Sequence, residues 1–339
     1  MKKIIEHSIV ASNLSKTLLY SLEYRLLNQL SKTFSHFVQA PYQEKDKELI
    51  HLLRDEVIKL HKEDAKNIAD GVYPIEVIKP KAAREHIKNL PQLVMDSLKI
   101  SRRRKYNIKK DFDIEPEDAP DYLKRNYHFQ TDGYFSEQSA KLYEHQVEVL
   151  FSGTAGPMRR MLIKKIKDKL KDNKPLRILE IGAGVGTATL DFSKSFNFSS
   201  YTVTDVSAPY LNVARSRFND PRFDFVQTAG ESLPFESGQF DLVFSVYLFH
   251  ELPSSVREMV LAESQRVLKE GGIMAICDSL QKDDEPKLNR VLENFPIDYH
   301  EPFYKGYTIW NVNESLKALG MKNITSDFKL LSKYWVAEK

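Results

Sequence analysis

The sequence predicts an α/β protein in which a mainly helical N-terminal region precedes a mostly parallel sheet. From about residue 175 onward, short runs of β-branched and aromatic residues alternate with helical stretches, which is typical of strands joined by helices. Before that point, leucines recur at three- and four-residue steps, the spacing of amphipathic helices. The two regions also differ in the sign of their charge, so we expect separate domains.

The overall composition is that of a folded chain. Its 339 residues leave room for about two domains of roughly 150 residues each. Hydrophobic residues make up 42% and charged residues 29%, which excludes wholesale disorder. No apolar run reaches the roughly 18 residues of a membrane-spanning helix, and Glu6 and His7 interrupt any signal peptide. Because Cys277 is the single cysteine, a disulfide framework and a cysteine-rich zinc site are both excluded. We expect a cytoplasmic protein that does not bind membranes.

The charge distribution helps to define the domains. Residues 1–125 carry 24 basic and 19 acidic side chains, whereas the remainder carries 26 and 28. A basic run at residues 102–110 is followed at once by an acidic, proline-bearing stretch at 111–121. Such a run can bind nucleic acid phosphates, but the adjacent opposite charges favour a solvated or self-neutralising linker. The predicted domains are a helical N-terminal domain at 1–121, a helical lid or linker at 122–174 and an α/β domain at 175–339.

The individual elements follow from these patterns. One amphipathic stripe runs through Leu14, Leu18, Leu19, Leu22, Leu26, Leu27 and Leu30, and a second runs through Leu49, Leu52, Leu53, Val57 and Leu60. Helical spacing returns between residues 122 and 170. Parallel strands are predicted at 177–181, 201–205, 223–227, 242–246 and 273–278, and a closing antiparallel hairpin at 324–331 and 333–337.

The most informative stretch is a glycine-rich loop between the first predicted strand and a helix. Gly182, Gly184 and Gly186 permit a tight turn and the close approach of a ligand to bare backbone. The next predicted strand ends in Asp205, whose carboxylate can accept both hydroxyl hydrogens of a ribose. The glycine spacing matches neither the G-x-G-x-x-G dinucleotide fingerprint nor a P-loop. Glu180 before the loop disfavours a pyrophosphate and suits a cationic ligand.

Together with the residues that follow, this loop resembles the first motif of the class I S-adenosylmethionine-dependent methyltransferases. The resemblance extends from about Leu176 to the C-terminus and implies a Rossmann-like, seven-stranded mixed sheet. It implies S-adenosylmethionine as the cofactor and methyl transfer as the reaction. The matching motifs, in the family's order, are LEIGAGVG at 179–186, VTDVS at 203–207, ESLPF at 231–235 with FDLVFS at 240–245, and HEL at 250–252 with RVLKEGG at 266–272.

The resemblance also implies which residues bind the cofactor. Where family members commonly place an aspartate for the adenine amino group, this chain has Ala229, so adenine must be held by the backbone at 230–231 or by the Glu231 side chain. Val206 and Leu233 either flank the adenine or belong to the core. The predicted cofactor-binding residues are Glu180, Gly182, Ala183, Gly184, Gly186, Asp205, Val206, Gly230, Glu231, Ser245 and Tyr134.

Methyl transfer is an in-line displacement that requires mainly proximity and alignment of the nucleophile. His250, just past the fourth strand, is the candidate general base, and its alternative role is to cap the next helix. In similar enzymes the helical stretch before the first motif covers the cofactor as a lid. This makes Tyr127, Gln130, Tyr134 and Tyr143 candidates for the methionine carboxylate or the substrate, with interdomain packing as the alternative. The predicted substrate-binding residues are Tyr127, Tyr247, Glu251, His300 and Tyr304.

Two classes of function remain open on the sequence. One is a methyltransferase for a small molecule with an O-, N-, S- or C-nucleophile. The other is a cofactor-binding module, or a methyltransferase, that the basic helical domain recruits to RNA or a protein. The absence of an Asn-Pro-Pro-Tyr/Phe element and of a Pro-Cys nucleophile disfavours DNA-base methylation. We expect a small-molecule partner, no nucleic acid and no metal, and the sequence predicts no oligomeric state.

Overall fold

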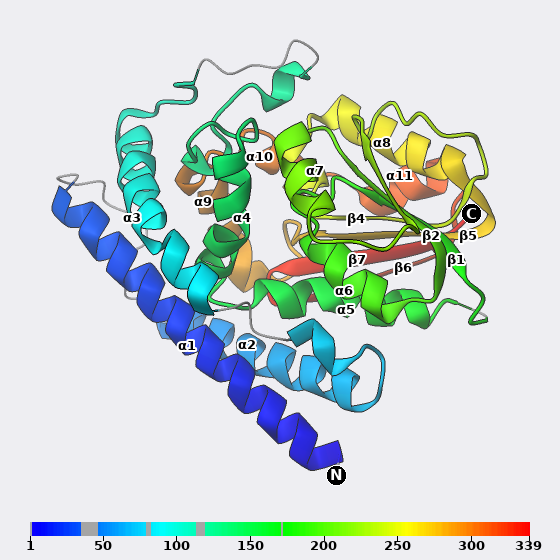
Figure 1. The fold of residues 1–339 in the computed structure, drawn as a ribbon, viewed down its shortest axis with the longest axis horizontal. Helices are drawn as coiled ribbons and strands as arrows, with labels where there is room; N and C mark the ends of the chain where they lie inside the picture. The colour runs from blue at the N-terminus through cyan, green and yellow to red at the C-terminus, as the bar shows by residue number, and fades with distance from the viewer. Residues whose placement is uncertain (1, 35–46, 79–82, 113–118, 171) are drawn as a thin grey trace.

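The computed structural model describes residues 2–34, 47–78, 83–112, 119–170 and 172–339. Helices dominate the part of the chain before the sheet, as predicted (Figure 1). None of the described helices is long and apolar enough to cross a membrane. The helices of this part are α1 (Lys2–Phe34), α2 (Lys47–Ala69), α3 (Ala83–Tyr106), α4 (Glu137–Leu150) and α5 (Ala155–Lys167).

The rest of the chain forms one seven-stranded sheet in the order β3-β2-β1-β4-β5-β7-β6. The first five strands are parallel, and β7 runs antiparallel to both β5 and β6. The predicted mixed sheet and its C-terminal antiparallel hairpin are therefore confirmed. The strands are β1 (Leu176–Ile181), β2 (Phe198–Asp205), β3 (Phe223–Gln227), β4 (Phe240–Val246), β5 (Leu268–Ser279), β6 (Lys322–Lys329) and β7 (Ser332–Glu338).

Helices cover both faces of the sheet, because successive side chains of each buried strand point to opposite faces. In β1, Ile178 packs in the cluster that contains residues of α5 and α6, whereas Leu179 and Ile181 pack in the cluster that contains residues of α8 and α11. The helices of this part are α6 (Thr187–Ser195), α7 (Ala208–Arg215), α8 (Ser254–Val267), α9 (Asn289–Asp298), α10 (Tyr304–Thr308) and α11 (Val312–Ala318).

The predicted leucine stripe of α1 forms a helix, but most of its side chains face solvent. Leu18, Leu22 and Leu26 are each more than half exposed. The buried face carries Asn13 and Glu23 in addition to apolar residues, because these polar groups have partners on neighbouring helices. Asn13 donates to Asp64 at 3.2 Å, and Glu23 lies 2.7 Å from Nε2 of His145. The stripe at residues 49–60 is more conventional, with Leu49 and Leu60 buried.

A buried ion pair joins α2 to α5, the helix that precedes β1 and contacts the sheet. Arg160 on α5 donates two hydrogen bonds to the carboxylate of Asp64 on α2, at 2.9 and 2.7 Å. The Asp64 side chain is fully buried and also accepts a hydrogen bond from the Tyr73 hydroxyl at 2.8 Å. The surrounding apolar cluster includes Ile9 of α1 as well as strand residues. The helices α1, α2, α5 and α6 therefore share one apolar core with the sheet. The predicted domain boundary at residue 121 stays a prediction.

We predict that Arg160→Met lowers the free energy of unfolding by about 3–5 kcal/mol, because it leaves the buried Asp64 carboxylate without its cation. Denaturant unfolding followed by circular dichroism measures this loss. The matched control is Arg54→Met, since Arg54 lies exposed on α2 and its replacement should change stability by no more than about 0.5 kcal/mol. Equal stabilities of the two variants would contradict the role of the ion pair.

Candidate functional site

A pocket lies at the carboxyl edge of the sheet, where the adjacent strands β2, β1 and β4 end. Open α/β sheets bind ligands at this edge. Loops after the strands form one side of the pocket, and segments that precede β1 form the other. The predicted cofactor residues that line it are Glu180, Gly182, Ala183, Gly184, Asp205, Val206, Gly230, Glu231 and Tyr134.

The glycine loop after β1 exposes bare backbone to this pocket. Gly182 and Gly184 have φ values of 68° and 57°, in the left-handed region that favours glycine. A Cβ atom at Gly182 would lie 2.9 Å from Cδ1 of Leu248, so a side chain there would clash. A Cβ atom at Gly184 would meet nothing within 4 Å, and Gly184 lines the pocket. Gly186 begins α6 with a φ of 74° but does not line the pocket.

Asp205 at the end of β2 is held by two backbone donors. Its Oδ2 accepts the Gly184 N–H at 2.8 Å, and its Oδ1 accepts the Ser207 N–H at 2.8 Å. Burial raises the pKa of Asp205 to about 6, although these backbone hydrogen bonds act in the opposite direction. An ionised carboxylate has about four lone-pair sites, so both oxygens keep capacity for a ligand's hydroxyl groups.

Glu180 lines the same pocket, but one of its oxygens is committed to the protein. Because it lies two residues after Ile178 in β1, its side chain points toward α6. Oε2 accepts hydrogen bonds from the hydroxyls of Thr189 and Tyr201, both at 2.8 Å. Burial raises the pKa of Glu180 to about 7 against the effect of these two hydrogen bonds. Its predicted contact with a cation is therefore left to the other oxygen.

The far end of the pocket, where adenine is predicted, is lined by Val206, Gly230 and Glu231. The Glu231 carboxylate already accepts a hydrogen bond from the hydroxyl of Tyr122, at 2.8 Å to Oε1. This bond links the lid segment to the loop after β3. Leu233, the other candidate neighbour of adenine, is buried in the apolar core and does not line the pocket.

Tyr134 and Tyr143 of the predicted lid form an aromatic wall with Tyr210 of α7. The rings of Tyr134, Tyr143 and Tyr210 meet edge to face, with centroids 5.2–6.2 Å apart. All three line the pocket, and the Tyr134 hydroxyl donates to Oε1 of Glu251 at 2.6 Å. Gln130 does not line the pocket, and its amide instead donates to Gly133 and Tyr210.

Arg159 on α5 is a pocket residue that the sequence reasoning missed. Among the described residues that line the pocket, Arg159 is the one Lys or Arg, and its side chain is 8% exposed. One terminal nitrogen contacts Oε1 of Glu148 at 3.2 Å. Its Nε is buried without a hydrogen-bond partner in the described structure, so the guanidinium keeps capacity for an anion. The only available signal was its place on the last helix before the glycine motif.

His250 does not line this pocket. Its Nδ1 lies 2.6 Å from Oδ1 of Asp278, and both side chains are buried. Burial alone would lower the pKa of His250, but the Asp278 carboxylate raises it to about 9. At neutral pH the ring is therefore mainly protonated, which does not suit a general base. The catalytic role of His250 stays a prediction that the geometry does not support.

The remaining predicted residues divide into two groups. Tyr247 and Glu251 line the pocket, and the Tyr247 hydroxyl hydrogen-bonds with that of Ser332 at 2.6 Å.

The other predicted residues are buried and do not line the pocket. Tyr127 donates to backbone oxygens, Tyr304 pairs with the Ser279 hydroxyl, His300 packs on Phe129, and the buried Ser245 hydroxyl has no partner among the described residues.

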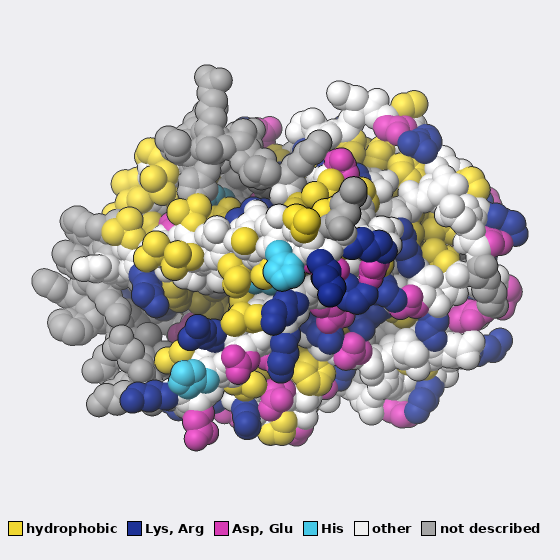
Figure 2. All heavy atoms as spheres, turned by 90° about the horizontal axis from the view of Figure 1, so that it is seen from below, with side chains coloured by type: hydrophobic (Ala, Val, Ile, Leu, Met, Phe, Trp, Pro, Cys, Tyr) yellow, Lys and Arg dark blue, Asp and Glu magenta, His cyan; other side chains and the backbone are white. Residues whose placement is uncertain are grey.

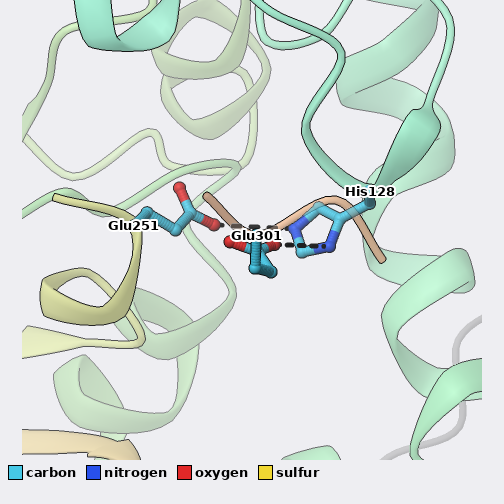
Figure 3. A group of neighbouring side chains, drawn as sticks. All are labelled: His128, Glu251 and Glu301. Carbon is cyan, nitrogen blue, oxygen red and sulfur yellow. Dashed lines mark ion pairs between the residues drawn. The ribbon is translucent and has the colours of Figure 1, made fainter. Parts of the chain in front are cut away.

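A second group of side chains meets at the edge of the pocket. His128, Glu251 and Glu301 point toward one another from three separate segments (Figure 3). Their potential ligand atoms all lie within 4.8 Å of one another. The sequence predicted no metal ligands. Within the described structure, these three residues form the group whose ligand atoms lie close enough together to hold a metal ion.

Comparison with known families locates the chain's similarity in the sheet domain. The model of the family described as "Methyltransferase domain" matches residues 178–272. This range contains most of β1, all of β2 to β4, the glycine loop, Asp205 and Glu251. The resemblance predicted from the four motifs is therefore confirmed for this part of the chain.

Individual methyltransferases are also similar to this chain. A fatty-acid O-methyltransferase of Mycolicibacterium smegmatis is 32% identical over 121 residues, which is 36% of this chain and 43% of the relative. Phthiotriol/phenolphthiotriol dimycocerosates methyltransferase 1 of Mycobacterium ulcerans is 35% identical over 102 residues, 30% of this chain and 37% of the relative. The chain thus spans less than half of these relatives. A crystal structure of a SAM-dependent methyltransferase from Methanosarcina mazei covers 52% of this chain and 96% of its own, at 20% identity and a TM-score of 0.40.

The raised pKa of Glu180 predicts a pH-dependent stability. Because the folded state favours the protonated acid, ionisation of Glu180 makes folding less favourable as the pH rises from about 5 to 8. We expect Glu180→Gln to gain about 2 kcal/mol of stability relative to the wild type over this range. Denaturant unfolding at pH 5 and pH 8 measures the difference, with the exposed Glu236→Gln as the control. A gain that is equal at both pH values would argue against a buried, ionisable Glu180.

Proposed function

We propose that this chain, which contains a class I S-adenosylmethionine-dependent methyltransferase domain, binds S-adenosylmethionine in the described pocket and methylates a small molecule. One observation carries the proposal. Within the matched residues, the Asp205 carboxylate and the open backbone at Gly184 face the same pocket and are joined by a hydrogen bond. This arrangement suits a ribose placed beside an uncovered loop.

The chemistry of the pocket fits each part of the cofactor. Asp205 is suited to the two ribose hydroxyls, and Val206 and Gly230 to the adenine. The free capacity of the Arg159 guanidinium suits the methionine carboxylate, because it is a buried cation with an unpartnered Nε. Glu180 offers its second oxygen to the amino group. The assignment thus places acids at the ribose hydroxyls and at the amino group of the methionine part, and the arginine at its carboxylate.

When bound, S-adenosylmethionine supplies a methyl group on a positively charged sulfur, which an acceptor's nucleophile displaces in line. The chain's own contribution is to position the reactants and exclude water. The rings of Tyr134, Tyr143 and Tyr210 line the pocket, and the face of an aromatic ring attracts a cation. The Tyr134–Glu251 hydrogen bond ties this wall to the turn after β4. A base is needed only for acceptors that must lose a proton early.

The acceptor's class is supported by the enclosure of the pocket and by the relatives' names. Lid residues and strand-end loops line the pocket together, which suits a molecule small enough to enter beside the cofactor. The two curated relatives are named for a fatty acid and for phthiotriol-type compounds, which are small molecules rather than nucleic acids. A cytoplasmic location remains part of this proposal.

Recruitment of RNA or a protein through residues 102–110 has less support. Arg103 is buried, forms an ion pair with Asp111 at 2.8 Å and donates to the backbone oxygen of Phe129 at 3.0 Å. Arg104 lies over the ring of Tyr299. Part of the basic run therefore holds the lid rather than facing a partner. Figure 2 shows one face of the molecule, on which Lys and Arg side chains gather near the middle with Asp and Glu side chains among them.

We predict that Asp205→Ala weakens binding of S-adenosylhomocysteine by at least about a hundredfold. The reason is that the two proposed hydrogen bonds from the ribose hydroxyls to the Asp205 carboxylate are lost. Isothermal titration calorimetry measures the affinity, and circular dichroism confirms the fold. Asp172→Ala is the control, since this aspartate is exposed before β1. Unchanged affinity in a folded Asp205→Ala variant would refute the ribose assignment.

We also predict that Arg159→Met weakens binding of S-adenosylhomocysteine by about 10–100-fold. The affinity for 5′-methylthioadenosine, which lacks the amino-acid carboxylate, should change less than about twofold. Calorimetry with both ligands separates a lost carboxylate contact from general damage to the pocket, and Arg54→Met serves as the surface control. Equal losses for the two ligands, or none for either, would be inconsistent with the proposed contact.

A further inference from the structure

We propose that His128, Glu251 and Glu301 bind one divalent transition-metal ion at the edge of the pocket, between the lid and the sheet domain. The proposal goes beyond methyl transfer and does not depend on the cofactor assignment. It concerns the three side chains that Figure 3 shows converging.

The three residues come from segments far apart in the sequence. His128 belongs to the 3₁₀ turn η3 (Tyr127–Phe129), Glu251 to the turn η4 (Phe249–Glu251), and Glu301 to the connection between α9 and α10. The two carboxylates face different nitrogens of the His128 ring: Nδ1 lies 3.0 Å from Oε1 of Glu301, and Nε2 lies 3.5 Å from Oε1 of Glu251. One ion would bind only one of these two nitrogens. Ligands bound at about 2.1 Å to one ion lie at most about 4.2 Å apart. Around a tetrahedral ion the ligand atoms lie about 3.4 Å apart, so the set, now within 4.8 Å, would have to contract by up to about 1.4 Å.

Glu301 is the most deeply buried of the three residues. Its side chain has no exposed surface, and neither carboxylate oxygen accepts a hydrogen bond from the described part of the chain. Buried carboxylates in proteins are normally hydrogen-bonded, paired or bound to metal. The Glu301 carboxylate points at His128, whose buried Nδ1 also has no hydrogen bond of good geometry. The fully buried Glu301 carboxylate thus has the His128 ring as its ion-pair partner at 3.0 Å, and its Oε2 has no hydrogen bond in the described structure.

A divalent ion would balance the charge of the three side chains. A protonated His128 between two carboxylates would leave one net negative charge in a buried site. The nearby His250 does not correct this, because it pairs with Asp278 and lies 4.0 Å from Glu251. A neutral His128 with two carboxylates and an M²⁺ ion sums to zero. Two carboxylates and one imidazole are also a donor set that Mn²⁺, Fe²⁺ and Zn²⁺ accept.

The position of the site connects it with the pocket. Glu251 lines the pocket and accepts the Tyr134 hydroxyl, so an ion bound to Glu251 would lie at the pocket wall. Three protein ligands leave coordination positions open for water or for an oxygen of an acceptor molecule. The ion would also cross-link the lid, through His128, to the turn after β4 and to the connection before α10.

Manganese binding to the full chain tests this proposal. After treatment with a chelator and its removal, the protein is titrated with Mn²⁺ and the free ion is measured by electron paramagnetic resonance. We expect one ion per chain for the wild type. Glu301→Gln and His128→Ala should bind at least about tenfold more weakly, because each removes a ligand. Glu314→Gln, an exposed acid on α11, should bind like the wild type.

The same preparations separate metal binding from the proposed function. Calorimetry with S-adenosylhomocysteine should give the same affinity for Glu301→Gln as for the wild type, since Glu301 does not line the pocket. This also verifies that the variant is folded. The proposal is refuted if the wild type takes up no Mn²⁺, or if the folded Glu301→Gln variant takes up as much as the wild type. Neither result would bear on cofactor binding.

Discussion

The hydrogen bond from the Gly184 N–H to the Asp205 carboxylate is the contact on which the rest of the pocket depends. It joins the loop after β1 to the end of β2, and it is possible because these neighbouring parallel strands end together, with Ile181 opposite Thr204. The left-handed conformation of Gly184 turns its N–H toward β2 while its open side faces the pocket. The loop, the acid and the sheet edge thus form one unit.

The electrostatics of the pocket follow from this unit. Asp205 and Glu180 are buried acids with raised pKa values, and each is partly stabilised by donors from the protein. Arg159 supplies a cation at the same pocket. A ligand that carries hydroxyl groups, an amino group and a carboxylate can therefore meet complementary groups at all three, which a dinucleotide with its two phosphates cannot.

The parts of the site that are local in sequence were predictable. The strands β1 and β2, the glycine loop and Asp205 lie within about 30 residues and follow from local spacing. Contacts between segments that are far apart in the sequence were not predictable from it. The leucines of α1 are exposed because the buried face of that helix carries polar residues with partners such as Asp64 on α2. Arg159 lines the pocket only because α5 packs beside the sheet. The convergence of His128 with Glu301 likewise depends on tertiary structure.

A crystal structure of the chain with S-adenosylhomocysteine is the most direct test of the central claim. The account predicts both ribose hydroxyls within hydrogen-bond distance of the Asp205 carboxylate, the adenine against Val206 and the carboxylate of the ligand on Arg159. A ligand bound at another place, or a ribose that makes no contact with Asp205, would contradict it.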